Sequence, residues 1–205
     1  MKIILIHGLG RTPFSLFWLA RYLQSQGFST QQFGYAPFAE TYNQIVHRFI
    51  NVLQQQAQQG DYSIVAHSLG SLITRSALGF ASSIQLPKHI VMLGPPNQLP
   101  RLASYAWRVP PFRWFTRECG FNLASSAFFE QLPSPPASYT IIAGTKGLCG
   151  VLSPFGDDIN DGIVALQETR ITDTDYVIEL PVIHTFMMNN QAVKQQVVKA
   201  LSSVL

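Results

Sequence analysis

The sequence predicts an α/β protein in which a doubly wound, mostly parallel sheet of about six strands is covered by helices on both faces. Apolar runs of strand length alternate with amphipathic stretches of helical period along most of the chain. Strands and helices that alternate in this way form parallel pairs through right-handed crossovers. The chain has 205 residues, and a chain of this length buries roughly 70% of the surface that its unfolded form exposes. We therefore expect residues 1–205 to form a single domain.

Each expected element follows from its own pattern of apolar residues and its boundaries. The strands are short apolar runs, expected at 2–6, 28–35, 63–66, 89–93, 139–143 and 176–180. The helices carry apolar residues at helical spacing, expected at 14–26, 42–59, 69–80 and 190–204. Gly27 and Gly60 end the first two helices, since glycine commonly terminates a helix. The segment 94–136 interrupts this alternation and is treated as an insertion or small cap.

The segment Ala66-His67-Ser68-Leu69-Gly70 lies directly between an apolar strand and a helix. It matches the nucleophile-elbow pattern G-x-S-x-G, with alanine in place of the first glycine. Such a sharp turn forces the serine into an unfavourable backbone conformation and requires small residues two positions away on either side. It also exposes the hydroxyl at a helix N-terminus, which favours developing negative charge. We expect Ser68 to be a nucleophile, the alternative being that it only caps the helix.

A serine hydroxyl needs a base, and in folds with this elbow the chain order is serine, acid, histidine. His7 and His67 lie inside the two motifs, His47 precedes the serine, and His89 starts the neighbouring strand. His184 remains, in the loop between the last strand and the last helix, where a base can reach the strand ends. We expect His184 to be the base and His7 to brace its own loop.

The acid is chosen by its position in the chain. Asp161 follows the strand at 139–143, and Gly162 after it suits a turn that holds a carboxylate toward a histidine. Asp158 is the second choice. The pair Asp157 and Asp158 is an alternative cation site, but calcium needs six to eight oxygen ligands and no EF-hand spacing is present. We expect no metal.

The early loop His7-Gly8-Leu9-Gly10 supplies the remaining part of a serine hydrolase site. The backbone amide of Leu9 is expected to pair with that of Leu69, the residue after the serine, as an oxyanion hole. The side chains of these two leucines matter little to that role.

These motifs, together with Asp161-Gly162-Ile163-Val164 and the closing histidine, resemble the α/β-hydrolase superfamily, especially small lidless bacterial lipases. The segments 92–97 and 184–188 look like those of bacterial α/β hydrolases of about this size. The resemblance spans nearly the whole chain. It implies an α/β-hydrolase fold and a triad of Ser68, Asp161 and His184, with the amides of Leu9 and Leu69 as oxyanion donors.

The expected activity is hydrolysis of carboxylic esters through an acyl-enzyme intermediate, without a cofactor. The substrate is expected to be a small-molecule ester or a lipid-like one. A thioesterase or an acyltransferase would use the same triad, because one fold hosts many reactions. A further alternative is an inactive hydrolase fold that serves as a binding module.

The insertion at 94–136 contains eight prolines and several large aromatic residues. Insertions of this length are uncommon between strands unless they are functional. It leaves the strand that follows the nucleophile helix, so we expect it to form part of the acyl-binding wall, with Trp107 and Trp114 in contact with substrate. The alternative is that these aromatic residues fill core beneath a long loop.

Composition excludes several other classes of function. Charged residues make up 12% of the chain, about half of what is typical, and the fourteen lysines and arginines are scattered. We therefore expect no nucleic-acid partner. The apolar runs are too short to form a transmembrane segment. The membrane contact that we consider is therefore a transient one, at the membrane surface. Cys119 and Cys149 are expected to be free thiols in a cytoplasmic protein.

Overall fold

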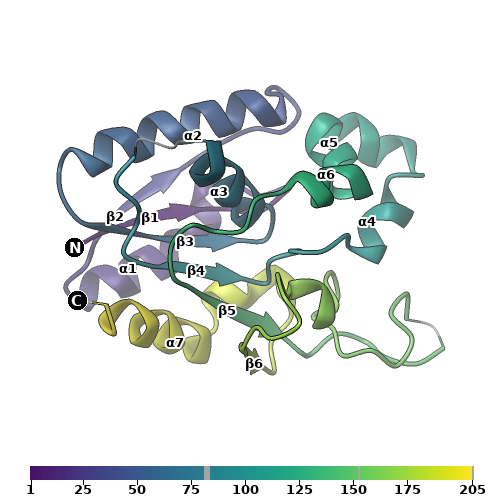
Figure 1. Cartoon of the computed structure of the whole chain (residues 1–205). Coiled ribbons are helices and arrows are strands. Elements are labelled where there is room, and N and C mark those ends of the chain that lie inside the picture. The colour runs from purple at the N-terminus through teal and green to yellow at the C-terminus, as the bar shows by residue number, and fades with distance from the viewer. Residues whose placement is uncertain (81–83, 152, 205) are drawn as a thin grey trace.

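The computed structural model describes residues 1–80, 84–151 and 153–204 (Figure 1). Six strands form one sheet in the order β2-β1-β3-β4-β5-β6, and every neighbouring pair is parallel. The strands are β1 Lys2–Ile6, β2 Ser29–Phe33, β3 Tyr62–His67, β4 Ile90–Leu93, β5 Tyr139–Gly144 and β6 Val177–Leu180. The expected sheet of about six strands is confirmed, and it is parallel throughout rather than mostly parallel.

The helices include every one that was expected and three more in the insertion. The α-helices are α1 Phe17–Ser25, α2 Tyr42–Ala57, α3 Leu69–Phe80, α4 Arg101–Ala106, α5 Pro110–Leu123, α6 Ser126–Gln131 and α7 Gln191–Ser202. The 3₁₀ helices are η1 Pro13–Leu16, η2 Gln167–Thr169 and η3 His184–Asn189. The helix expected at 14–26 is divided into η1 and α1. Pro13 starts η1, because its fixed φ and missing N–H suit the first turn of a helix.

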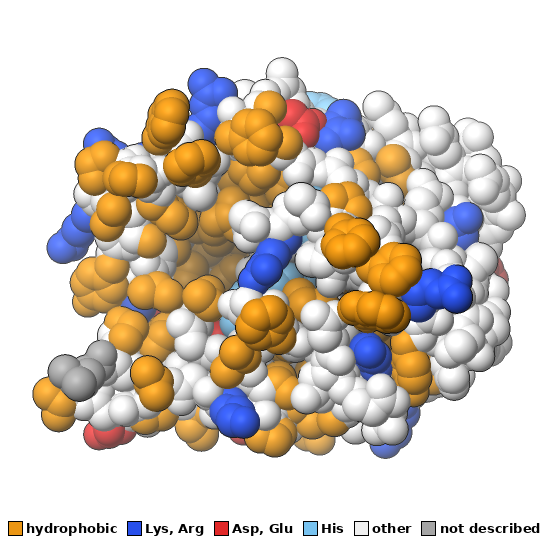
Figure 2. Space-filling view, turned by 180° about the vertical axis from the view of Figure 1, so that it is seen from behind, with side chains coloured by type: hydrophobic (Ala, Val, Ile, Leu, Met, Phe, Trp, Pro, Cys, Tyr) orange, Lys and Arg blue, Asp and Glu red, His pale blue; other side chains and the backbone are white. Residues whose placement is uncertain are grey.

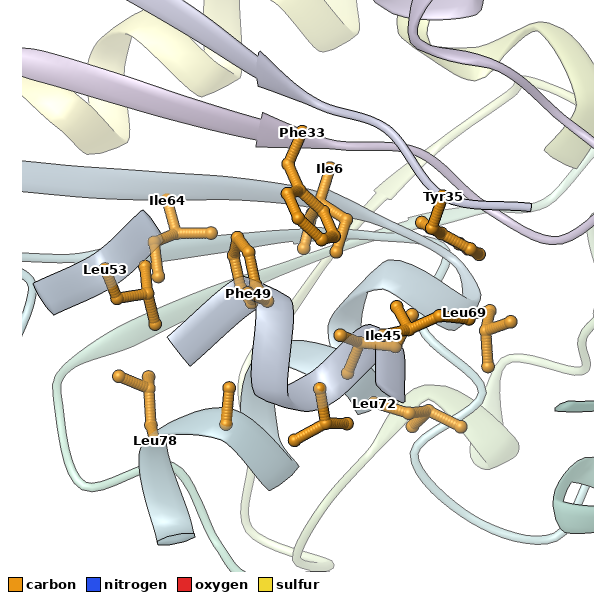
Figure 3. Close-up of a cluster of buried hydrophobic side chains, with 14 of the residues drawn as sticks. Ile6, Phe33, Tyr35, Ile45, Phe49, Leu53, Ile64, Leu69, Leu72 and Leu78 are labelled. Atoms are coloured by element: carbon orange, nitrogen blue, oxygen red, sulfur yellow. The ribbon is translucent and has the colours of Figure 1, made fainter. Parts of the chain in front are cut away.

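The sheet is covered by helices on both faces, as the sequence predicts. Buried side chains of α2 and α3 pack against one face, and those of α1 and α7 pack against the other. Figure 3 shows the first of these layers, where Phe49 of α2 lies between Phe33 and Ile64 of the sheet. All six residues of β3 are buried, as expected for a central strand of a parallel sheet with both faces covered.

The strand order reverses direction between β1 and β3. The chain leaves β1 toward β2 at one edge, while β3 leads through β4 and β5 toward the other edge. In open α/β sheets, ligands bind at such a switch point, in the crevice outside the carboxyl ends of the strands. The two loops at this point follow Ile6 and His67, so they contain His7-Gly8-Leu9-Gly10 and Ser68.

The insertion at 94–136 is fastened to the helix that follows Ser68. The guanidinium of Arg75 in α3 donates to the carbonyl oxygens of Asn97, Leu132 and Pro133, at 2.9–3.2 Å, and to Asn97 Oδ1 at 3.1 Å. Burial lowers the pKa of Arg75 to about 10. Because Asn97 and Leu132 lie near opposite ends of the insertion, one side chain holds both of its ends against α3.

A second long connection, residues 145–176, joins β5 to β6. It is held by polar contacts, including an isolated antiparallel bridge between Asn160 and Ala165. The Asn160 side chain is buried, donates to the carbonyls of Leu148 and Asp158, and accepts from the Gly162 amide. In the ranges that the structure describes, no helix is long and apolar enough to cross a membrane.

Candidate active site

Ser68 forms a sharp turn between a strand and a helix. β3 ends at His67 and α3 begins at Leu69, so Ser68 alone connects them, with φ at +52°. This left-handed backbone is unfavourable for a residue with a side chain and is typical of functional sites. The Ser68 amide donates to the Leu93 carbonyl at 2.9 Å, which fixes the turn to β4. Ser68 therefore lies in a strained turn between the end of β3 and the start of α3.

Two glycines allow the loops to approach one another around Ser68. A Cβ on Gly70 would lie 2.7 Å from the carbonyl oxygen of His7, and a Cβ on Gly8 would lie 2.9 Å from the Ser68 Cβ. Both distances are shorter than real Cβ contacts, so larger residues would push the first loop away from α3. This is the steric reason for the small residue two positions after the serine.

Asp161 and His184 form a buried pair at the same edge of the sheet. His184 Nδ1 lies 2.7 Å from Asp161 Oδ2, and the two residues are 6% and 1% exposed. The other carboxylate oxygen, Oδ1, accepts from the amides of Ile163 at 3.0 Å and Val164 at 2.8 Å. The His184 amide also donates to the Asp161 carbonyl at 2.9 Å. Because the carboxylate binds Nδ1–H, Nε2 is left as the basic nitrogen of the ring.

The His184 ring packs against a glycine of the loop after β4. Gly94 has a φ of +53°, and a Cβ there would lie 2.9 Å from His184 Nδ1 and 3.0 Å from Met187 Sδ. On the other side of the pair, a Cβ on Gly144 would lie 2.7 Å from the Asp161 Cβ. The pair therefore fits only because the ends of β4 and β5 carry glycine.

Ser68 and His184 line one cavity of about 480 Å³. We call it the Ser68 cavity. Its wall is mainly apolar and is formed by Leu9, Gly10, Arg11, His67, Ser68, Pro96, Pro100, Leu102, Ala103, Ala106, Phe112, Leu123, Ile163, Val164, His184 and Thr185. Figure 2 shows a hollow on this side of the molecule, bordered by hydrophobic side chains and with histidine in it. Seven of the lining residues belong to the insertion.

The two tryptophans predicted to contact substrate do not line this cavity. Trp107 packs edge-on against Phe121, with ring centroids 5.7 Å apart. Trp114 is 76% exposed and lies beside Phe115. The insertion instead presents smaller residues of α4 to the cavity, above all Ala103 and Ala106. Sequence reasoning missed these because two alanines carry no signal of their own.

Two backbone amides near Ser68 have no hydrogen-bond acceptor among the described residues. Leu9 lines the Ser68 cavity, and Leu69 is the first residue of α3, where helical amides lack an intrahelical partner. Among the residues that the structure describes, neither amide donates a hydrogen bond. Backbone N–H groups in folded proteins normally donate to a hydrogen-bond acceptor. Two N–H groups without an acceptor, close to a serine, are suited to bind an oxyanion.

His67 packs beside His184 without taking its place. Its ring centroid lies 4.9 Å from that of His184, and its Nε2 lies 3.3 Å from the His184 carbonyl oxygen. Burial holds the pKa of His67 well below its ordinary value, and the charge of His184 lowers it further. A neutral His67 therefore donates from Nε2 and helps to hold the His184 backbone.

His7 has the bracing role expected from the sequence. The Tyr35 amide donates to His7 Nε2 at 3.3 Å, so the proton is on Nδ1, which donates to the Gly8 carbonyl at 2.9 Å. The imidazole is stacked on the Tyr35 ring at 4.2 Å between centroids. These contacts hold the first loop in place beneath Leu9.

The second choice for the acid is engaged elsewhere. Asp158 is mostly exposed and forms an ion pair with Arg101, at 2.6 Å between Oδ2 and Nη2. His47 is exposed, and His89 binds the hydroxyls of Ser138 and Thr140. Within the described ranges, no group of three or more histidine, cysteine or acidic side chains is arranged to hold a metal ion. The structure thus brings together Ser68, Asp161 and His184 but not Asp158.

The buried histidines predict how stability depends on pH. Burial lowers the pKa of His7, His67 and His89 below 6.5, so the unfolded chain binds protons more readily than the folded one. Their contribution to stability is complete above about pH 6.5 and is lost progressively as the pH falls below that value. We expect the free energy of unfolding in urea to fall over this interval. His67→Gln should reduce the slope, whereas the exposed control His47→Gln should keep it. A parent protein equally stable at pH 7.5 and 5 would contradict this prediction.

Comparison with solved protein structures identifies the fold of the chain. No family model and no curated protein sequence matches the chain. Among solved structures, the mature form of lipase BlEst2 from Bacillus licheniformis matches with a TM-score of 0.75 and 19% identity, over 98% of this chain and 91% of that one. The RedJ thioesterase of prodiginine biosynthesis in Streptomyces coelicolor matches with a TM-score of 0.63 and 13% identity, over 100% and 90%.

Phospholipase PlaB from Legionella pneumophila matches with a TM-score of 0.65 and 18% identity, over 83% of this chain. The match covers 46% of the phospholipase. The matched structures include further α/β hydrolases. Together with the six-stranded parallel sheet, these matches show that the chain has the α/β-hydrolase fold, as the sequence resemblance implies.

Proposed function

We propose that the protein is a serine hydrolase that cleaves carboxylic esters through Ser68, His184 and Asp161. The observation that carries the proposal is the buried Asp161–His184 pair, whose histidine lines the same cavity as the strained Ser68 turn. A histidine oriented by a carboxylate and a serine at a helix N-terminus are the two parts that acyl transfer requires. The α/β-hydrolase fold supports the same class of reaction.

In the proposed mechanism, Ser68 Oγ attacks the ester carbonyl while His184 Nε2 takes the hydroxyl proton. The amides of Leu9 and Leu69 stabilise the oxyanion, and the protonated His184 then gives its proton to the leaving alcohol. Water, activated by the same nitrogen, hydrolyses the acyl-enzyme. Asp161 keeps the proton on Nδ1 and stabilises the imidazolium that forms in each half of the reaction.

Covalent labelling tests the proposal directly. A fluorophosphonate probe should react with the folded protein, and peptide mass spectrometry should locate the label on Ser68. Protein denatured before labelling is the control, because the activation of Ser68 depends on the folded site. Labelling of another residue, or no labelling together with no hydrolysis of p-nitrophenyl butyrate, would contradict the proposal and favour a binding module.

Thioester hydrolysis and acyl transfer remain the alternatives on the same residues. The structural similarity to a thioesterase favours testing the first. Hydrolysis of butyryl-CoA should be compared with that of p-nitrophenyl butyrate at equal enzyme concentration. Adding an acceptor alcohol tests transfer, since an acyltransferase would form a new ester in place of the free acid.

The cavity wall supports a small-molecule or lipid-like acyl group. Large apolar side chains are also exposed on η1, α1, α5 and η3, namely those of Phe14, Trp18, Trp114, Phe115 and Phe186. Exposed apolar surface of this kind marks binding sites for ligands, proteins or membranes. We propose that these side chains make transient contact with a lipid surface when the substrate is lipid-like.

The length of the acyl chain should depend on Ala106. Its side chain lines the cavity from α4, so Ala106→Phe should fill space that a long acyl chain would occupy. We expect kcat/KM for p-nitrophenyl esters of eight or more acyl carbons to fall about tenfold relative to the butyrate, since overpacking typically costs 1–3 kcal/mol. Ser104→Phe, on the same helix but outside the lining, is the control. An unchanged profile from two to twelve carbons in Ala106→Phe would show that acyl chains do not pass α4.

A further inference from the structure

Arg11 brings a permanent positive charge into a mainly apolar cavity. It follows Gly10, whose φ of +64° turns the loop after Leu9, and it lines the Ser68 cavity half-buried. The other lining residues in the described ranges include two histidines and no aspartate or glutamate. A cation in such a wall has no evident role in holding a neutral acyl chain.

The Arg11 guanidinium has little to bind within the protein. Nη2 donates to the Thr185 carbonyl at 3.5 Å, at the limit of a hydrogen bond. Among the described residues, no carboxylate lies within ion-pair distance of it. By contrast, Arg48 and Arg101 each pair with a carboxylate at 2.6 Å. Since a guanidinium has five N–H donors, most of those of Arg11 remain for a ligand.

Within the part of the chain that the structure describes, the wall of the cavity has no acidic side chain, and the Asp161 carboxylate behind it is already bound by His184 and two backbone amides. The first acidic residue of the chain is Glu40, and its carboxylate binds Arg48 and the Ala36 amide. The charge of Arg11 acts within the site, because it adds to burial and to the charge of His184 in lowering the pKa of His67. An anionic group entering the cavity would therefore meet positive potential at Arg11 and no acidic side chain of the wall.

Arg11 lies close to the base of the proposed mechanism, because its Nη2 donates to the Thr185 carbonyl at 3.5 Å. Its partner Thr185 directly follows His184, which in the proposed mechanism protonates the leaving alcohol. Apolar residues of α4 and α5 form another part of the wall, which suits the acyl part of an ester. We propose, resting on the proposed function, that Arg11 binds a phosphate or carboxylate on the alcohol part of the substrate, so that the preferred substrate is an ester of an anionic alcohol.

Binding to a variant that cannot turn over tests this proposal separately from catalysis. In the Ser68→Ala background, calorimetric titration should give a Kd for 1-butyrylglycerol 3-phosphate at least about tenfold lower than for neutral 1-butyrylglycerol, because hydrogen bonds to charged groups are among the stronger ones. O-butyryl lactate tests a carboxylate in place of the phosphate. The difference should shrink as NaCl is raised, as expected for a partly exposed charge.

Three further substitutions, each made in the Ser68→Ala variant, distinguish anion binding by Arg11 from a structural role of Arg11 in holding Thr185. Adding Arg11→Gln should remove the preference for the anionic esters, and Arg11→Lys should restore part of it, since lysine keeps the charge but not the planar fork. Arg21→Gln changes an exposed arginine of α1 that is outside the cavity lining, and it should keep the preference.

Equal affinity for the neutral and anionic esters, or a preference that survives Arg11→Gln, would overturn the assignment. So would a loss of affinity for all three esters alike in Arg11→Gln, because that is the result expected of a structural brace. Hydrolysis of p-nitrophenyl butyrate by the parent protein tests the proposed function on its own. A charge-dependent affinity without hydrolysis would support the Arg11 site and reject the ester hydrolase.

Discussion

Ser68→Ala is expected to abolish ester hydrolysis while the protein stays folded. In the proposed mechanism the Ser68 hydroxyl is the attacking group, so its removal leaves only the oxyanion amides and substrate binding to act on the ester. Loss of a triad serine typically lowers kcat by a factor on the order of 10⁶. The measurement is kcat for p-nitrophenyl butyrate, with active-site titration of the parent to exclude contamination.

The fold should tolerate this change because the Ser68 side chain contributes little to packing. Its Oγ makes no hydrogen bond with the described residues, and alanine is as small as serine in the same left-handed turn. Ser71, one turn further along α3, is the matched control. Its buried Oγ lies 3.3 Å from the Ala66 carbonyl, so Ser71→Ala should cost some stability and retain activity. Hydrolysis that persists in Ser68→Ala would remove Ser68 from the mechanism.

The strands were predictable because strands of a parallel sheet covered on both faces are apolar along most of their length. β1 and β4 are nearly continuous apolar runs, and their residues are almost all buried. The edge strand β2 was also found, although its sequence Ser-Thr-Gln-Gln-Phe is mostly polar, because the flanking Phe28 and Tyr35 are apolar. The conformation of the connection at 145–176 could not be predicted from the sequence. It depends on side-chain hydrogen bonds such as those of Asn160, and these leave no periodic apolar pattern.

The candidate site was predictable where chain order and turn chemistry determine it. The elbow around Ser68 carries its own pattern, and His184 followed by elimination. The cavity wall was not predictable, because which side chains face it depends on how the insertion folds. Within α5, for example, Arg117 has a φ of +46°, which interrupts the helix between the lining residues Phe112 and Leu123. A count of aromatic residues therefore pointed to Trp107 and Trp114, while Phe112, Ala103 and Ala106 form the wall.

Asp161→Asn is expected to lower kcat by several orders of magnitude. The carboxylate accepts from His184 Nδ1–H and from two backbone amides. An amide side chain has one acceptor oxygen, which the Ile163 and Val164 amides already require. Its NH₂ group would then face His184 and favour the tautomer with the proton on Nε2, which cannot accept the proton of Ser68. In a serine protease, the corresponding change of tautomer lowers kcat about 10⁴-fold. The measurements are kcat and kcat/KM for the hydrolysis of p-nitrophenyl butyrate.

Asp158→Asn is the matched control, because it makes the same chemical change three residues away in the same loop. The substitution removes only an exposed ion pair between Asp158 and Arg101. Exposed ion pairs typically contribute about 0–1 kcal/mol to stability. Arg101 keeps its second partner, since its Nε lies 3.1 Å from Glu168 Oε1. We therefore expect Asp158→Asn to retain kcat within about twofold. If Asp158→Asn were the inactive variant and Asp161→Asn the active one, the orienting acid would be Asp158, and the buried Asp161–His184 contact would be structural only.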